Sequence, residues 1–346
     1  MASISKRTIF FTGATGYVGG TVLTRLVDHP TFANSEITLL VRPSKKDKIS
    51  ALHSLGLNTV LGSYNDLDIL EEQASKADIV FSVADADNLA AAQAILRGLK
   101  RRYEATGQQP LLIHTSGTGV LVDDAKGLYP TDVIYDDLNP DRINALAITQ
   151  LHRNVDVAIV DADNENYVKA YIILPPTIYA LAKTRFVDLG LQNPRSLQIP
   201  QLIRAGLLKG QGGMVGKGEN VWPNVHIDDI ADLYIIVYEN ALSGKAGHGR
   251  EGFYFGENGE HKLYDLSKVV AQELYNVGRG KSPEPAPFTE EDYKRPENFG
   301  LEFLGTNARC LARRARALGW KPKYTTEDAF KSIKPEVEYV IQSGNY

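Results

Sequence analysis

Short apolar runs alternate with segments of helical periodicity along most of this chain. Residues 7–12 (RTIFFT) form an apolar run that stops at a cluster of glycines, and Val18, Val22 and Leu26 then recur at helical spacing. The alternation continues, and it predicts further strands at residues 36–41, 57–61, 79–83, 111–114, 168–174 and 253–255. Helices are predicted between them at residues 45–55, 67–75, 89–103 and 228–242.

Strands that are apolar on both faces and alternate with helices are typical of a parallel sheet covered on both sides. We therefore predict an α/β fold with a doubly wound parallel Rossmann sheet of about seven strands. The segments outside this alternation predict a smaller, mostly helical C-terminal substrate domain, with helices at residues 197–208 and 307–318. The expected division is 1–180 with 225–256 for the sheet domain, and 181–224 with 257–346 for the capping domain.

The turn after the first predicted strand reads TGATGYVGG, with Gly13, Gly16 and Gly19 three residues apart. Glycines at a strand-to-helix turn let the backbone approach a pyrophosphate, and the helix amino terminus offers that group free amides. The predicted dinucleotide-binding residues of this turn are Gly13, Thr15, Gly16, Tyr17, Val18 and Gly19. In the alternative interpretation the glycines serve only the turn.

The residues after the second predicted strand favour one form of the dinucleotide. An acid at this place would bind the ribose hydroxyls of NAD(H), whereas a basic residue favours the 2′-phosphate of NADP(H). Arg42 and Lys45 follow the strand, and the first acid is Asp47. We therefore predict NADP(H) as the cofactor. The alternative is that these charges form only a solvated loop.

The composition and charge of the chain exclude several classes of binding partner. The formal net charge of −4 over 346 residues gives no basic footprint for nucleic acid. The single cysteine, Cys310, cannot close an intrachain disulfide, and the first apolar run is too short for a signal peptide or a membrane span. The seven histidines show no close pairing with Cys or Glu, so no metal site is predicted. We expect a cytoplasmic protein with a small-molecule substrate and no membrane partner, and a homodimer is a candidate assembly.

At this point the motifs resemble the extended, two-domain branch of the short-chain dehydrogenase/reductase superfamily. TGATGYVGG is similar to its TGxxGxxG opening, HTSGTG to its serine segment, and ILPPTIYA to its proline-bearing cofactor loop. The finer pattern is similar to atypical NmrA-like and epimerase/dehydratase-like members. The resemblance implies that Ser116 polarises a substrate oxygen, and Thr118 is a second candidate hydroxyl. It also implies that Ala84 and Pro176 contact the cofactor.

The family's proton donor is a tyrosine paired with a lysine on the helix before the sixth strand. The matching stretch here, LAITQLHRNVD, contains neither residue type. Depending on the register, Thr149 and Arg153, or Ile148 and His152, occupy the two positions. Threonine is a very poor proton donor, whereas Arg153 is predicted to hold the ribose or phosphate of the cofactor.

Other side chains are therefore considered as donors. Tyr179 precedes Lys183 by four residues but follows the sixth strand, and Tyr135 lies in the loop between Ser116 and the catalytic helix. His152 is a candidate proton shuttle near neutral pH, although a helical histidine is more often packed or capping. The predicted catalytic set is Ser116, Thr118, Tyr135 and Tyr179.

The sequence thus predicts an NADP(H)-dependent oxidoreductase of a small-molecule carbonyl or alcohol that works without the usual Tyr-x-x-x-Lys pair. The first alternative is a non-catalytic NmrA-like regulator that senses NADP and binds a protein partner. The second is an epimerase, dehydratase or isomerase of a small metabolite. Further residues expected at the substrate are Asp85, Phe186, Trp222 and Asn224. The arginines of residues 307–318 either recognise an anionic substrate or form the solvated face of a helix.

Overall fold

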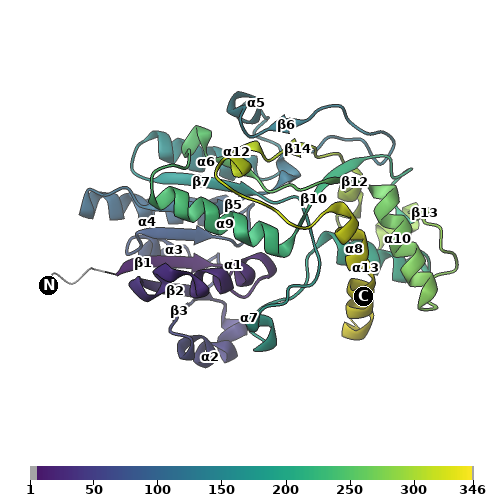
Figure 1. The fold of residues 1–346 in the computed structure, drawn as a ribbon, viewed down its shortest axis with the longest axis horizontal. Coiled ribbons are helices and arrows are strands. Elements are labelled where there is room, and N and C mark those ends of the chain that lie inside the picture. Colours follow the sequence, from purple (N-terminus) through teal and green to yellow (C-terminus); the bar gives the residue numbers. More distant parts are fainter. Residues whose placement is uncertain (1–5, 345–346) are drawn as a thin grey trace.

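A single seven-stranded parallel sheet lies at the centre of the protein (Figure 1). The computed structural model describes residues 6–344. The strands are β1 (Arg7–Thr12), β2 (Ser35–Val41), β3 (Asn58–Leu61), β4 (Ile79–Ser82), β5 (Leu111–Thr115), β7 (Lys169–Leu174) and β11 (Phe253–Phe255). Their order is β11-β7-β5-β4-β1-β2-β3, and every neighbouring pair is parallel. The predicted doubly wound sheet is confirmed.

Helices cover both faces of this sheet. One layer contains α1 (Tyr17–Asp28) packed on α9 (Ile227–Leu242), and the other contains α3 (Leu67–Ala74), α4 (Leu89–Thr106) and α6 (Arg153–Asn164) (Figure 1). Because the strands are covered on both sides, their side chains are buried on both sides, as at Phe10, Phe81 and Ile172. Each such side chain stabilises the fold by roughly 1.5–3 kcal/mol.

Local signals fix where the helices begin and end. The side chain of Asn88 accepts a hydrogen bond from the amide of Ala91 at 3.0 Å and caps α4. The same helix ends at Gly107, whose φ of +67° suits a residue without a side chain. At α9 the ring of His226 accepts from the amide of Asp228 at 3.1 Å.

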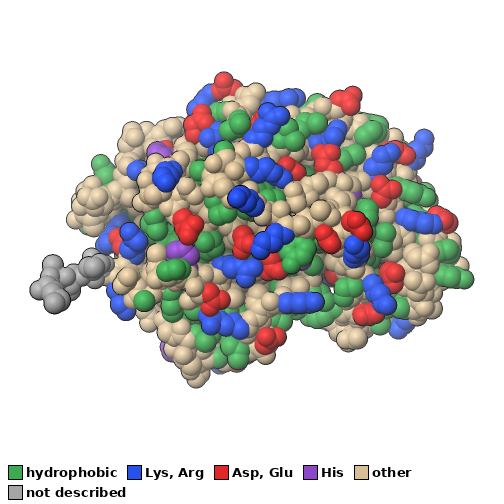
Figure 2. All heavy atoms as spheres, viewed as in Figure 1, with side chains coloured by type: hydrophobic (Ala, Val, Ile, Leu, Met, Phe, Trp, Pro, Cys, Tyr) green, Lys and Arg blue, Asp and Glu red, His purple; other side chains and the backbone are tan. Residues whose placement is uncertain are grey.

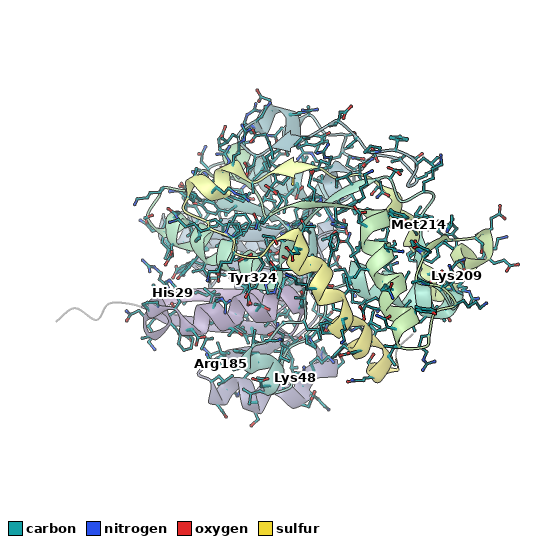
Figure 3. All side chains as sticks on the ribbon, turned by 45° about the vertical axis from the view of Figure 1, so that its right-hand side comes forward. His29, Lys48, Arg185, Lys209, Met214 and Tyr324 are labelled. Carbon is teal, nitrogen blue, oxygen red and sulfur yellow. The ribbon has the colours of Figure 1, made fainter. Side chains whose placement is uncertain are left out.

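A smaller unit lies beside the carboxyl edge of the large sheet and has its own cluster of buried apolar side chains. Its strands are β8 (Thr177–Tyr179), β10 (Val221–His226) and β12 (Glu260–Lys262), with a short pair β9 (Gly213–Met214) and β13 (Ala286–Pro287). Its helices are α8 (Gln198–Lys209), α10 (Leu263–Asn276), α11 (Glu290–Lys294) and α13 (Thr326–Ser343). Figure 3 labels Lys209 and Met214 on this unit, and Lys48 on the large one.

The prediction of an arginine-rich helix at residues 307–318 is wrong for most of that range. Residues Cys310–Leu311 form β14, which pairs with β6 (Tyr135–Asp136), and only Arg313–Ala317 are helical, as α12. The backbone amide of Tyr135 donates to the carbonyl of Arg309 at 3.0 Å, which joins the two segments. The alanines of this segment pack on the core of the large sheet, as Ala308 and Ala315 show.

The helix predicted at residues 45–55 is split. Pro43 opens a 3₁₀ helix, η2 (Pro43–Lys48), and α2 (Ile49–Ser54) follows it. The backbone also departs from helical geometry inside η2, at Lys45, whose φ is −123°. The short helices α5 (Pro140–Asn144) and α7 (Arg185–Asp188) lie in loops. The other 3₁₀ helices are η1 (Pro30–Asn34), η3 (Thr118–Leu121), η4 (Gly249–Glu251), η5 (Pro296–Asn298) and η6 (Leu301–Gly305).

The surface carries both signs of charge. Figure 2 shows Lys and Arg interspersed with Asp and Glu over the face in view, without a large field of one sign. Within residues 6–344, no helix has both the length and the apolar character needed to cross a bilayer.

Candidate functional site

The turn between β1 and α1 is a tight backbone cradle. The amide of Gly16 donates to the carbonyl of Gly13 at 2.8 Å, and no side chain caps the start of α1. Gly13 has a φ of +77°, and a Cβ placed there would lie 2.7 Å from the carbonyl oxygen of Val83. A Cβ on Gly19 would overlap the Gly13 carbonyl. The turn therefore needs glycine at both positions, and the amides that open α1 lie at the positive end of its dipole.

This turn opens on a cavity of about 530 Å³ at the carboxyl edge of the sheet, between the two units. The ends of β1, β4, β5 and β7 contribute to it because parallel strands place their carboxyl ends at one edge. The lining residues are Gly16, Tyr17, Val18, Gly19, Val83, Thr115, Ser116, Gly117, Gly119, Leu151, His152, Pro175, Pro176, Ile178, Asn193, Arg195, Ser196, Leu197, Gln198, Gln201, Trp222 and Phe303. The glycine turn, Ser116 and the proline loop thus all line the same cavity.

Ser116 is bonded to a buried carboxyl. Its Oγ lies 3.0 Å from Oδ2 of Asp156, which stands in the first turn of α6. Burial raises the pKa of Asp156 to about 7, and the hydrogen bond from Ser116 offsets part of that rise. Oδ1 of Asp156 has no hydrogen-bond partner within residues 6–344. Near neutral pH this carboxyl therefore exists in both protonation states.

His152 stands immediately before α6, four residues ahead of Asp156. Its backbone has a φ of +65°, a left-handed conformation that costs about 1–2 kcal/mol for a residue with a side chain. Asp87, in the loop after β4, accepts hydrogen bonds at Oδ1 from the backbone amide of His152 at 3.1 Å and from its ring Nδ1 at 2.7 Å. Asp87 thereby fixes both the backbone and the ring of His152.

The catalytic stretch predicted as one helix is only partly helical. α6 begins at Arg153, so Thr149 and Ile148 lie in turns ahead of it. Arg153 does not line the cavity: it is buried, and its Nη2 donates to the carbonyl of Asn144 at 3.0 Å. Its guanidinium lies in a separate hollow with Asn144 and Arg250. The predicted contact between Arg153 and the cofactor therefore finds no support, because the residue faces the other side of α6.

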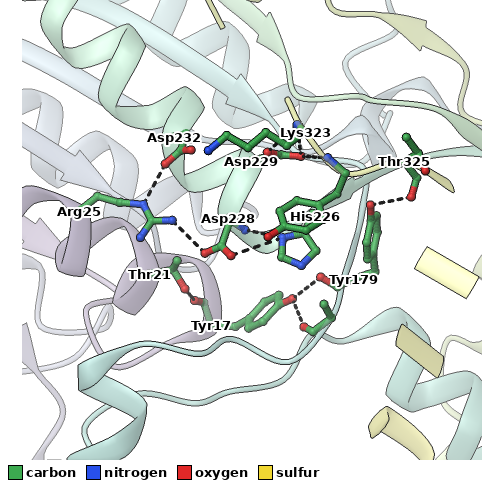
Figure 4. A network of polar contacts seen from close by, with 12 residues as sticks. Tyr17, Thr21, Arg25, Tyr179, His226, Asp228, Asp229, Asp232, Lys323 and Thr325 are labelled. Atoms are coloured by element: carbon green, nitrogen blue, oxygen red, sulfur yellow. Dashed lines mark hydrogen bonds and ion pairs between the residues drawn. The ribbon is translucent and has the colours of Figure 1, made fainter. Parts of the chain in front are cut away.

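Tyr179 lies in β8 and does not line the cavity, and Figure 4 shows its side chain bonded toward Thr325. Its hydroxyl donates to the carbonyl of Thr325 at 2.8 Å, which ties the strand to the start of α13. Tyr17 takes a neighbouring place, with its hydroxyl 3.0 Å from the carbonyl of Tyr179 and 2.5 Å from that of Ala180. Burial raises the pKa of Tyr179 above its ordinary value, so its phenol is a poor acid as well as a misplaced one.

The other two predicted donors are also outside the cavity. Tyr135 pairs through its backbone with Cys310, and the guanidinium of Arg142 lies 4.9 Å from its ring centre. Thr118 is fully buried in η3, and its Oγ1 finds no hydrogen-bond partner in the described part of the chain. Of the four predicted catalytic residues, Ser116 alone lines the cavity.

The predicted cofactor residues divide in the same way. Gly16, Tyr17, Val18, Gly19 and Pro176 line the cavity, whereas Gly13 supports the turn from behind. The others do not line it. They are Thr15, whose carbonyl accepts from the Asn193 amide at 3.0 Å; Ala84, beside Gly13; Arg42, exposed after β2; and the half-buried Lys45.

The substrate side is built mainly from apolar side chains. The ring of Trp222 packs edge-on against Phe303 with 5.3 Å between centres, and its Nε1 donates to the carbonyl of Thr306 at 2.6 Å. Leu151 and Leu197 are partly exposed at the cavity. Three residues expected here are elsewhere: Phe186 is in the core, Asn224 bonds within the small unit, and Asp85 is exposed beyond the lining.

Sequence reasoning missed Asp87, Asp156 and Arg195. Asp156 carried a usable signal, because it interrupts the buried face of α6 between Val155 and Ile159 and lies one turn after His152. Asp87 and Arg195 carried none, since both belong to loops whose course the sequence pattern does not define. Within residues 6–344, no group of three or more His, Cys, Asp or Glu side chains is placed to hold a metal ion.

Comparisons with known proteins show a family relationship. Residues 5–101 match the profile of the NmrA-like family. The chain is 31% identical over 343 residues to oxidase ucsJ of Acremonium sp., covering 91% of this chain and 92% of that protein. It is 25% identical over 329 residues to the uncharacterized protein C2A9.02 of Schizosaccharomyces pombe, covering 92% and 96%.

Solved structures show the same fold at low identity. UDP-glucuronic acid 4-epimerase from Bacillus cereus, in complex with UDP-glucuronic acid and NAD, superposes with a TM-score of 0.60 at 15% identity, over 97% of this chain and 99% of the epimerase. UDP-glucose 4-epimerase from Thermotoga maritima gives a TM-score of 0.61 at 16% identity, over 97% and 99%.

Proposed function

The chain belongs to the extended, atypical short-chain dehydrogenase/reductase superfamily with an NmrA-like amino-terminal region, and from this premise we propose that it is an NADP(H)-dependent oxidoreductase of a small-molecule carbonyl or alcohol. The observation that carries the proposal is the single cavity lined by both the glycine turn and Ser116. A nicotinamide dinucleotide and a substrate oxygen would therefore meet there. A relative that covers most of the chain is an oxidase, which supports the same class.

The residues present fit such a cofactor. Gly13 and Gly19 leave no room for a side chain where the backbone would approach the pyrophosphate, and the amides of Tyr17, Val18 and Gly19 would bind it. Arg42 would pair with the 2′-phosphate, and Pro176 would flank the nicotinamide. When bound, the cofactor supplies or accepts a hydride.

Ser116 would orient the substrate oxygen. When Asp156 is protonated, its carboxyl can donate to Ser116 Oγ, and the serine hydroxyl is then free to donate to the substrate. When Asp156 is ionised, it can only accept, so the serine proton is held away from the substrate. The pKa of Asp156, raised to about 7 by burial, therefore favours carbonyl activation at neutral and lower pH.

The lining suggests which substrates suit the cavity. Leu151, Ile178, Trp222 and Phe303 would surround a substrate placed beside Ser116, and Arg195 supplies the one Lys or Arg side chain of the lining in the described residues. A sugar nucleotide carries two phosphates that need more positive charge than this. We therefore propose a largely apolar carbonyl compound or alcohol as the substrate class.

Two other functions have some support. α6 contains neither tyrosine nor lysine in its twelve residues, which favours a regulator that binds NADP(H) and a protein partner without turnover. The fold is shared with epimerases and a dehydratase, and this supports epimerisation or dehydration of a small metabolite as the second alternative.

The deciding experiment combines binding with turnover. Calorimetry should detect NADPH and NADP⁺ binding, and a panel of aromatic and aliphatic carbonyls should be screened by loss of NADPH absorbance. Ser116→Ala should lower kcat about 100- to 1000-fold, because it removes a hydrogen bond to the developing oxyanion. Ser54→Ala, on exposed α2, is the matched control. Binding of NADP⁺ and NADPH with different affinities, without consumption of any carbonyl, would support the regulator instead.

A further inference from the structure

The ring of His152 is anchored, and it does not serve as a helix cap. Its Nδ1 lies 2.7 Å from Oδ1 of Asp87, and the ring makes no hydrogen bond to the amides that open α6. A carboxylate only accepts hydrogen bonds, so Nδ1 carries the proton of this bond. The left-handed backbone of His152 persists because Asp87 also holds its amide.

The other ring nitrogen faces the cavity. A Cβ added at Gly117 would lie 3.1 Å from Nε2 of His152, and one added at Gly119 would lie 3.2 Å from it. Within residues 6–344 no hydrogen bond to Nε2 is present, and His152 lines the same cavity as Ser116. Gly117 and Gly119 therefore place no side chain against the imidazole, which shares the cavity with Ser116.

We infer that His152, oriented by Asp87, is the acid–base group of this site and replaces the tyrosine that the family normally uses. This inference rests on the proposed oxidoreductase function. In carbonyl reduction a hydride from the nicotinamide dinucleotide forms the new C–H bond, and the carbonyl π pair moves to oxygen. That oxygen takes the Nε2 proton of the imidazolium. His152 is then neutral and keeps its Nδ1 proton, which stays hydrogen-bonded to Asp87. Solvent restores the Nε2 proton. Alcohol oxidation runs these steps in reverse.

The charges around the imidazole suit this role. Asp87, from the loop after β4, faces Nδ1 and stabilises the imidazolium by charge. His114, on β5, is neutral at working pH because burial lowers its pKa to about 3. Asp156, one turn along α6, is the third titratable group, and burial raises its pKa to about 7. The carboxyl of Asp87 thus faces the ring directly, His114 adds no charge near neutral pH, and Asp156 is ionised in part of the molecules there.

His152→Asn tests the role with a residue that tolerates a left-handed backbone. With NADPH and 4-nitrobenzaldehyde as the probe, kcat should fall about 100- to 10,000-fold. The pH profile of kcat should also change in the variant, because only the contribution of Asp156 to that profile remains. Asp87→Asn keeps an oxygen acceptor but removes the charge, so it should lower kcat by less. His53→Asn, an exposed histidine bonded to Thr59, is the control.

A second measurement needs no turnover and no cofactor. Ring-¹⁵N-labelled histidine in the apo protein should show His152 as the Nδ1–H tautomer at alkaline pH, with the signal assigned by its loss in His152→Asn. The preference should disappear in Asp87→Ala. An Nε2–H tautomer in the wild type would overturn the inference, as would a folded His152→Asn variant with wild-type kcat and pH profile. Wild-type protein that fails to bind NADPH would instead contradict the proposed function, and the tautomer would still decide whether Nε2 is free.

Discussion

The hydroxyl of Ser116 and the carboxyl of Asp156 are joined by a fully buried hydrogen bond of 3.0 Å that spans 40 residues of sequence. The bond places an ionisable group directly behind the residue proposed to orient the substrate. Burial raises the pKa of that carboxyl from 3.8 to about 7. Stability and substrate activation are therefore coupled to the same proton.

This coupling predicts a pH-dependent effect of Asp156→Asn on stability. Because the folded-state pKa lies above the unfolded value, the folded protein binds the proton more tightly. The wild-type free energy of unfolding should thus fall as pH rises from about 4 to about 7 through this group, by about 4 kcal/mol at most. Asp156→Asn removes that loss, so its Tm relative to wild type should be higher at pH 8 than at pH 4.

Asp161→Asn is the matched control, since Asp161 is exposed on the same helix. In the control, the difference in Tm from the wild type should be the same at pH 4 and at pH 8. A wild-type and Asp156→Asn pair with parallel Tm profiles from pH 4 to pH 8 would contradict the assignment of a raised pKa to Asp156.

Gly13→Ala should weaken NADPH binding by at least about tenfold, or 1.4 kcal/mol. The new methyl group would meet the Val83 carbonyl at 2.7 Å, and its backbone would be strained at a φ of +77°. Gly107→Ala is the control, because its φ of +67° imposes the same strain with nothing within 4 Å. Calorimetry should show loss of affinity in the first variant, and loss of thermal stability alone in the second.

Arg42→Glu should change the cofactor preference. Removing the positive charge after β2 should raise the Kd for NADPH about tenfold, a cost of about 1.4 kcal/mol, and leave the Kd for NADH nearly unchanged. Lys334→Glu makes the same change of charge on an exposed part of α13 and should affect neither. An unchanged NADPH to NADH ratio in Arg42→Glu would remove the basis for naming NADP(H).

Tyr179→Phe distinguishes a structural tyrosine from a catalytic one. The variant loses the hydroxyl that donates to Thr325, so the free energy of unfolding should fall by about 1 kcal/mol. kcat should stay within about twofold of wild type, since the phenol does not line the cavity. Denaturant unfolding and NADPH turnover on the same samples measure both, and a hundredfold fall in kcat would restore Tyr179 as a donor.

The sequence by itself determined the parallel sheet and the glycine turn. The side chains of an apolar run such as residues 7–12 can be buried on both sides only between two layers of helices. β1 begins and ends where its pattern predicts. The turn could also be predicted from the sequence. A φ above zero at Gly13 and the lack of space at Gly19 are local requirements that only glycine meets. Ser116 was found because HTSGTG resembles the serine segment of the family, and it lies directly after β5.

The tertiary structure alone decided which groups face the cavity. The sequence puts Tyr179 near Pro176, yet β8 turns the phenol toward Thr325. The sequence separates His152 from Asp87 by 65 residues, yet the start of α6 and the loop after β4 come together in the fold. Side-chain direction depends on packing between distant segments, and this information is absent from the local periodicity that defines strands and helices.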